Sequence, residues 1–318
     1  MKAVGVWEYG GPEALQVLDL PEPNPGPGEV RIRVHAAAVN PTDTLLRAGA
    51  HASRMKGLKP PYVPGMDAAG VVEKLGPGAD HRLEVGQPVV ALVMPTGALG
   101  GAYAEQIIAA AASVVPAPEG IDFPAASTLL MNALTARLAI DALHLSPGQA
   151  VAITGAVGAL GGYAIQLAKA DGLRVIADAA SADEPLVRKL GADEVVARGM
   201  DVADRIRALA PDGVPGLVDG AVLNELVLPA LADGGAVSVV RGWDGQTERG
   251  ITLHQILCSR QATATDLLER LSRQAGDGTL SLRVADILPA ARAADAHRLL
   301  AAGGIRGRLV LDLTNFDG

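Results

Sequence analysis

A glycine-rich turn between an apolar strand and a helix constrains the fold of this chain more than any other feature. The apolar stretch 151–153 runs into the turn, and a helical pattern begins near Leu160. Glycine allows a sharp turn and a close approach to a pyrophosphate, and the N–H groups at a helix start hold the phosphates. We therefore predict dinucleotide contacts at Gly155, Ala156, Gly158, Ala159, Leu160 and Gly161. A glycine-rich structural turn without a ligand is the alternative.

Strands and helices alternate along the rest of this region. Apolar strand patterns occupy 150–154, 174–177, 194–196, 217–218 and 236–240. Helical patterns occupy 121–145, 160–171, 184–190, 202–209 and 223–231. Strands that alternate with helices form right-handed βαβ units, so the region predicts an α/β domain with a doubly wound parallel sheet.

The first third of the chain has a different pattern. Val30, Ile32 and Val34 alternate with polar residues, which is the period of a half-buried strand. Further short strands at 70–74, 87–93 and 113–116 are separated by glycine and proline turns. Short strands at such spacing predict a β-barrel or sandwich. The tail adds helices at 266–275 and 291–302 and a last strand at 308–313.

Composition excludes several classes of protein. The 318 residues carry 27 Lys+Arg and 35 Asp+Glu, a formal net charge of -8, which argues against nucleic-acid binding through a basic face. Cys258 is the single cysteine, so neither an internal disulfide nor a zinc site with two cysteines can form. A length of this order predicts two domains.

One stretch without charged side chains, 142–168, is long enough to span a bilayer. Prolines and glycines interrupt it, and the strand–turn–helix explains it better. Glu8 interrupts the N-terminal apolar residues, so we expect no signal peptide. We therefore expect a cytoplasmic protein with no membrane partner and no nucleic-acid partner.

The second strand of the parallel sheet bears on the choice of cofactor. An acidic residue at its end binds the ribose 2′-hydroxyl of NAD, and that position here is Ala179. Asp178 stands one residue earlier, on the opposite face of the strand. Ser181 and Arg198 could then bind a 2′-phosphate, so NADPH is favoured over NADH. The alternative for Arg198 is a solvated surface arginine.

With these residues in place, the chain resembles the medium-chain dehydrogenase/reductases, in their zinc-free quinone oxidoreductase (zeta-crystallin-like) branch. The resemblance covers nearly the whole length and rests on EYGGPE at 8–13, PGPGEV at 25–30, VNPTD at 39–43, PGMD at 64–67, GGAYAE at 100–105, LTA at 134–136, LGAD at 190–193 and GRLV at 307–310. It implies a GroES-like β-barrel catalytic domain over 1–120 and 263–318, interrupted by a Rossmann dinucleotide-binding domain over 121–262. Homodimers are common in that family, so we expect one here.

The resemblance also implies the reaction, which is hydride transfer from NADPH to a quinone or an α,β-unsaturated carbonyl. Asn40 resembles the family's cofactor- and substrate-side asparagine, and Asp43 would orient its loop. Thr135 resembles the threonine near the nicotinamide ribose, and Arg308 matches a basic position that can face the cofactor phosphates. The alternatives are an Asx-type capped turn for Asn40 and Asp43, a helix-interior threonine, and a solvated strand-end charge for Arg308.

Two further residues are predicted from their place in the sequence. Tyr62 could line the cleft as an oxyanion donor, with a packing tyrosine as the alternative. Arg241 follows the strand 236–240, where a parallel sheet presents residues to its ligand crevice, and a surface charge is the alternative.

The zinc-dependent branch of the superfamily has a His-Glu pair where Met66-Asp67 stands, so we expect no metal. Three alternatives to an NADPH-dependent reductase of quinones or enones stay open. An enoyl-thioester reductase of polyketide or fatty-acid type differs from the leading one in its substrate. A non-catalytic NADPH-binding sensor would bind the cofactor without turnover. A zinc alcohol dehydrogenase would carry zinc and oxidise alcohols.

Overall fold

Strand β3 (Glu29–Ala38) is the centre of the first sheet in this computed structural model, which describes residues 1–79 and 82–316. It pairs antiparallel with β4 (Asp67–Leu75), β6 (Gln106–Ala110) and β15 (Arg308–Asp312). The predicted alternation along β3 is confirmed, because its apolar side chains are buried and Arg33 is exposed. The strand order is β14-β15-β3-β4-β5-β7, where the remaining bounds are β14 (Val284–Pro289), β5 (Pro88–Leu92) and β7 (Val114–Pro116).

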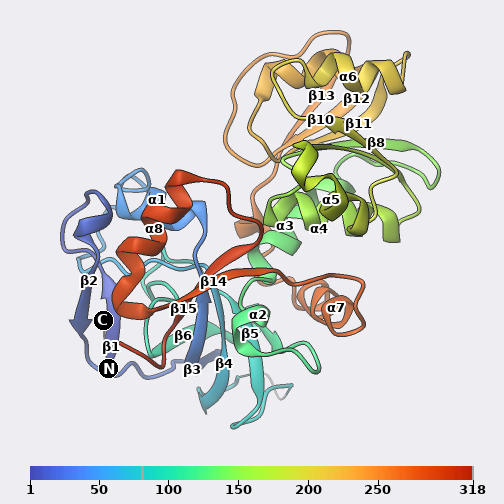
Figure 1. Ribbon diagram of the computed structural model, residues 1–318. Helices are drawn as coiled ribbons and strands as arrows, with labels where there is room; N and C mark the ends of the chain where they lie inside the picture. The colour runs from blue at the N-terminus through green and yellow to red at the C-terminus, as the bar shows by residue number, and fades with distance from the viewer. Residues whose placement is uncertain (80–81, 317–318) are drawn as a thin grey trace. The chain divides into compact units, whose positions relative to one another are not determined.

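A short hairpin and several helices complete this part of the chain (Figure 1). Strands β1 (Lys2–Gly5) and β2 (Gln16–Asp19) form a separate antiparallel pair. The helices are α1 (Pro41–Arg47), α2 (Phe123–Ala126), α7 (Thr265–Gly276) and α8 (Ala293–Ala302). Helix α2 begins as predicted, because the Asp122 carboxylate accepts the Ala125 N–H at 2.8 Å and Pro124 stands in the first turn.

The second sheet is wholly parallel, as the βαβ pattern predicts. Its order is β10-β9-β8-β11-β12-β13. The bounds are β8 (Ala150–Thr154), β9 (Arg174–Ala179), β10 (Glu194–Ala197), β11 (Val214–Asp219), β12 (Leu231–Val239) and β13 (Thr252–Gln255). The helices are α3 (Leu130–Asp141), α4 (Ala159–Ala170), α5 (Glu184–Lys189) and α6 (Val202–Leu209). Parallel pairing brings the carboxyl ends of all these strands to one edge of the sheet.

Contacts divide the chain into two units. The first contains Met1–Met131, Gln261–Asp277 and Leu282–Gly318, and the second contains Asn132–Arg260 and Gly278–Ser281. Residues 121–131, which the sequence assigns to the dinucleotide-binding domain, fall in the first unit. The reason is that α2 packs against β3, β4, β14 and β15.

Three local expectations differ from the structure. The predicted helix 121–145 is divided into α2 and α3. The predicted helix at 223–231 is a 3₁₀ segment, Asn224–Ala230, because Pro229 removes a backbone donor inside it. Strands β1, β2, β6, β13 and β14 were not expected. The apolar stretch Phe123–Asp141 is long enough to cross a membrane, but most of it is buried within the protein.

Candidate functional site

The glycine turn joins β8 to α4 with almost no free space around its backbone. Gly155 has a φ of +66°, in the left-handed region that favours glycine. A Cβ on Gly155 would lie 2.7 Å from the carbonyl carbon of Gly220, and a Cβ on Gly161 would lie 2.3 Å from the Gly155 oxygen. The packing therefore requires glycine at both positions.

Helix α4 starts immediately after this turn, with Gly158 as its N-cap. The N–H groups of the first turn, on Ala159, Leu160 and Gly161, have no carbonyl partner within the helix. They lie at the positive end of a twelve-residue helix dipole. Such a donor set fits the phosphates of a dinucleotide, which is the arrangement that the motif predicts.

The Ala156 N–H has a different partner within the same turn. It donates to the Asp178 carboxylate of β9 at 3.1 Å. Burial raises the pKa of Asp178, while this hydrogen bond and the positive charge of Arg198 act in the opposite direction. Alternation along the strand directs Asp178 and Ala179 to opposite faces of the sheet. Asp178 thus belongs to the structure of the turn, a role that the sequence pattern does not reveal.

Ser181 and Arg198 follow neighbouring strands at the carboxyl edge of the sheet. Ala179 of β9 is paired with Ala197 of β10, and the Arg198 N–H donates to the Ala179 carbonyl at 3.0 Å. Both Ser181 and Arg198 are exposed. The structure therefore brings these two predicted residues to one end of adjacent strands, next to β8 and its turn.

Arg241 lies farther along the same edge. It follows β12 and is exposed. Strands β8 and β11 stand between β9 and β12 in the sheet. Arg241 is thus separated by these two strands from the end of the sheet where Ser181 and Arg198 lie.

Thr135 is a buried residue in the middle of α3.

In the first unit, Asn40 and Asp43 form a buried hydrogen-bonded loop. Asp43 accepts the Asn40 N–H at 2.8 Å and the Gly65 N–H at 3.1 Å. Its side chain also accepts the Tyr103 hydroxyl at 3.1 Å. Burial raises the pKa of Asp43 to about 7, with its three hydrogen bonds opposing the shift. Asp43 therefore joins the Asn40 loop to the turn at Gly65, and with Asn40 it forms the capping box of α1, as the capped-turn alternative expects.

Asp67 is a second buried carboxylate in this cluster, and sequence reasoning missed it. Its carboxylate accepts the Asn40 side-chain amide at 2.8 Å and the Met131 N–H at 2.8 Å. Burial raises the pKa of Asp67 to about 6, against the effect of these hydrogen bonds and the positive charge of Arg308. The PGMD motif contains Asp67, but neither hydrogen-bond partner of its carboxylate lies within that motif.

The burial of Arg308 and the contacts of Tyr62 distinguish between the roles predicted for these two residues. Arg308 is buried at the start of β15, so it is not the solvated strand-end charge of the alternative. Its positive charge acts to lower the pKa of Asp67 and the pKa of Tyr103, while burial raises both. Tyr62 is half-buried, and its ring stacks on Tyr9 with centroids 5.0 Å apart. The Tyr62 hydroxyl donates to the Leu58 carbonyl at 3.3 Å. These contacts are those of a packing tyrosine.

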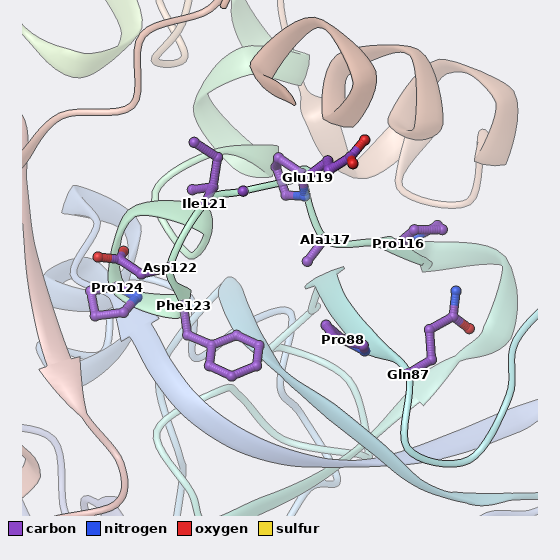
Figure 2. Close-up of a pocket in the computed structure, with 11 residues that line it drawn as sticks. Gln87, Pro88, Pro116, Ala117, Glu119, Ile121, Asp122, Phe123 and Pro124 are labelled. Atoms are coloured by element: carbon purple, nitrogen blue, oxygen red, sulfur yellow. The ribbon is translucent and has the colours of Figure 1, made fainter. Parts of the chain in front are cut away.

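Over 1–79 and 82–316, no group of three or more His, Cys, Asp or Glu side chains is arranged to hold a metal ion. A groove of about 590 Å³ in the first unit has apolar walls that include Pro88, Ile121 and Phe123 (Figure 2). None of the residues that line it is a predicted site residue.

Two family models match the chain. The alcohol dehydrogenase GroES-like domain matches residues 26–119, and a model described as zinc-binding dehydrogenase matches residues 159–272. The matches confirm the expected fold class, a GroES-like domain together with a Rossmann-like domain.

Individual relatives span both domains. The quinone oxidoreductase of Sus scrofa is 32% identical over 98% of this chain and 97% of its own length. A solved NAD-dependent alcohol dehydrogenase is 32% identical, with a TM-score of 0.85 over 98% of this chain and 99% of its own. A mycobacterial protein solved in complex with NADPH is 27% identical, with a TM-score of 0.86 over 98% and 99% of the two chains. The chain therefore belongs to the medium-chain dehydrogenase/reductase superfamily, and within it to the quinone oxidoreductase family.

Proposed function

We propose that this oxidoreductase transfers hydride from NADPH to a quinone or an α,β-unsaturated carbonyl, without zinc. The observation that carries the proposal is the turn at Gly155 with the α4 N-terminus behind it, a donor set suited to dinucleotide phosphates. The quinone oxidoreductase relatives support the acceptor class, and the NADPH-bound neighbour supports the cofactor. The proposal therefore names a class of acceptor and no individual substrate, because one fold serves many substrates.

The chemistry of the first unit supports a reaction without zinc. In place of the His-Glu pair of the zinc branch stand Met66 and Asp67, and both side chains are engaged. The Met66 sulfur accepts the Thr42 hydroxyl at 3.2 Å, and Asp67 accepts from Asn40 and Met131. Conjugated carbonyls and quinones accept hydride when they are correctly positioned and their developing oxyanion is stabilised, so no Lewis acid is required.

The glycine turn, the Asn40 loop and Tyr62 then have defined tasks. The first-turn N–H groups of α4 bind the phosphates, and Asn40, with Asp43 behind it, orients the reacting groups. Tyr62 would stabilise the acceptor oxyanion only by releasing the Leu58 carbonyl. The bound nicotinamide supplies the hydride, and a proton completes the hydroquinone or the saturated carbonyl compound.

NADH is a second candidate cofactor, because one observation favours it. The Asp178 carboxylate lies at the glycine turn, and acidic groups near this place bind the ribose hydroxyls of NAD. Ala179, Ser181 and Arg198 support NADPH instead, since they leave a neutral position, a hydroxyl and a cation for a 2′-phosphate.

The test follows NADPH and NADH oxidation by absorbance with purified, EDTA-treated protein. Acceptors are o- and p-quinones, simple enones and a short enoyl thioester. NADPH-dependent turnover of a quinone or enone is the expected result. A preference for the enoyl thioester would identify the alternative enoyl reductase. NADPH binding without turnover of any acceptor would indicate a sensor, and loss of activity with EDTA that zinc restores would contradict the metal-free mechanism.

We also propose a cytoplasmic homodimer. Strand β13 ends the order of the parallel sheet, and the backbone groups of an edge strand can pair with a second copy. Light scattering coupled to size-exclusion chromatography tests the dimer, and cell fractionation tests the compartment.

A further inference from the structure

We propose that Asp67 is a positioning residue of this reductase, which fixes the orientation of the Asn40 amide and holds the first turn of α3. The inference rests on the proposed function, since the position of Asn40 affects the rate only if Asn40 orients the reacting groups. It concerns a residue of the PGMD motif that is not among the predicted site residues.

The chemistry of the Asp67 carboxylate determines the orientation of the amide. An ionised carboxylate only accepts hydrogen bonds, so the group that Asn40 directs at Asp67 must be its Nδ2 donor. The Asn40 Nδ2 lies 2.8 Å from Asp67 Oδ2. The Asn40 Oδ1 is therefore directed away from Asp67, toward the Asp43 N–H in the capping box of α1, so both ends of this buried amide are fixed. Amide orientation is otherwise easily reversed, because the two ends have nearly the same shape.

The backbone on both sides of this hydrogen bond is fixed. Asp67 is the first residue of β4 and is paired with Ala38 of β3, two residues before Asn40. Asp43 holds the Asn40 backbone N–H at 2.8 Å. Separate carboxylates thus hold the two kinds of donor on Asn40: Asp43 holds the backbone, and Asp67 holds the side chain. Both side chains of the Asn40–Asp67 pair are buried, which strengthens the hydrogen bond and makes its loss costly.

The second oxygen of Asp67 extends the same control to α3. Asp67 Oδ1 accepts the Met131 N–H at 2.8 Å, in the first turn of that helix. A negative charge at this end of a helix is favoured by its dipole. One carboxylate therefore holds both the Asn40 side chain and the Met131 N–H, two groups of the first unit.

The experiment compares Asp67→Asn with the wild type. The two carboxylate oxygens of Asp67 each accept from a different donor. An amide keeps only one of these oxygens, and its NH₂ group would face the other donor. We expect kcat to fall about 10- to 100-fold, the usual effect of misplacing a reacting group. The KM for NADPH should change little, because the phosphate-binding turn is intact. Asp67→Glu keeps a carboxylate and should recover part of the loss. Asp19→Asn, which alters an exposed partner of Lys2, is the matched control and should leave kcat unchanged.

A double mutant separates positioning from a general loss of stability. If Asp67 acts through Asn40, then Asp67→Asn in an Asn40→Ala background should cause little further loss of kcat. Losses that multiply fully would overturn the proposal.

A readout that needs no turnover keeps this test separate from the proposed function. In nitrogen-15 NMR spectra, Asp67→Asn should shift the Asn40 side-chain amide signal and accelerate hydrogen exchange at the Met131 amide. Unchanged signals at both would overturn the proposal. A wild type that reduces no acceptor would instead overturn the proposed function, and the NMR result would still decide whether Asp67 holds both groups. If Asp67→Asn does not fold, Asp67→Glu serves for the same spectra, with smaller changes expected in the same direction.

Discussion

The Tyr103 hydroxyl donates to the Asp43 carboxylate at 3.1 Å and lies 3.3 Å from Nε2 of His297 on its other side. Because the hydroxyl proton is directed at the carboxylate, the Tyr103 oxygen is left to accept, and His297 must carry its proton on Nε2. Burial lowers the pKa of His297 to about 3, so its ring stays neutral near pH 7. Three segments far apart in sequence are thereby joined by one directed set of hydrogen bonds.

Tyr103→Phe should reveal the energetic value of this arrangement. The substitution removes a donor from buried Asp43 and leaves the Nε2–H of buried His297 without its acceptor. We expect a loss of about 1–3 kcal/mol in the free energy of unfolding, measured by urea denaturation. Tyr62→Phe is the matched control, since its hydroxyl donates to a single carbonyl in a half-buried place. A loss for Tyr103→Phe no larger than for Tyr62→Phe would contradict the argument.

The ionisation of Asp43 should make stability depend on pH. Its pKa is about 7 in the folded protein and about 3.9 in an unfolded chain. Between these values the folded state holds a proton that the unfolded state has lost, so this contribution is complete below about pH 4 and is lost as pH rises through about 7. Asp67, with a pKa of about 6, acts in the same direction.

Asp43→Asn should therefore reduce the decline in unfolding free energy between about pH 4 and pH 7, measured by urea denaturation at several pH values. Asp19→Asn provides the control. The hydrogen bond from Lys2 lowers the pKa of Asp19, so any effect of that variant falls at more acidic pH. An unchanged slope in Asp43→Asn would show that Asp43 does not titrate in this range.

Gly155→Ala should impair cofactor binding more than its backbone conformation alone would explain. The matched control is Gly148→Ala, since Gly148 has a φ of +86° with no heavy atom within 4 Å of an added Cβ. Both variants incur a left-handed backbone cost of about 1–2 kcal/mol. Only Gly155→Ala also meets the backbone of Gly220 and so displaces the turn. We expect the Kd for NADPH, measured by calorimetry, to rise at least about tenfold, or about 1.4 kcal/mol. Equal effects in the two variants would refute a ligand-binding turn.

Cofactor selectivity should depend on Arg198. Arg198→Ala is expected to raise the KM for NADPH about tenfold, because a charged hydrogen bond to the 2′-phosphate is lost, while the KM for NADH stays constant. Equal effects on both cofactors would remove Arg198 from the 2′-phosphate pocket. Asp178→Asn distinguishes the competing reading, since a rise in the KM for NADH alone would make Asp178 the ribose-binding acid.

Local patterns in the sequence predict the architecture well. The alternation along β3 and the strand–turn–helix at Gly155 depend on neighbouring residues, so both are visible without the structure. Strand β14 was missed because its residues, VADILP, do not alternate between apolar and polar side chains, and its position depends on pairing with β15.

The hydrogen-bonded cluster of the first unit was predicted only in part. Asn40 and Asp43 lie three residues apart within one motif, which made them visible together. The partners that complete the cluster are Asp67, Tyr103 and His297, which come from distant parts of the chain. A buried polar contact between such distant residues leaves no periodic trace in a sequence, so only the fold reveals it.

The pairing of β15 with β3 also sets an order for folding during synthesis. The ribosome releases residues 132–260, which make up most of the second unit, before it releases Arg308–Asp312. The inserted unit can therefore fold while β3 still lacks one neighbour, with the backbone groups opposite Ala36–Ala38 exposed to other chains. The nascent protein is thus most prone to aggregation late in translation, until β15 pairs with β3.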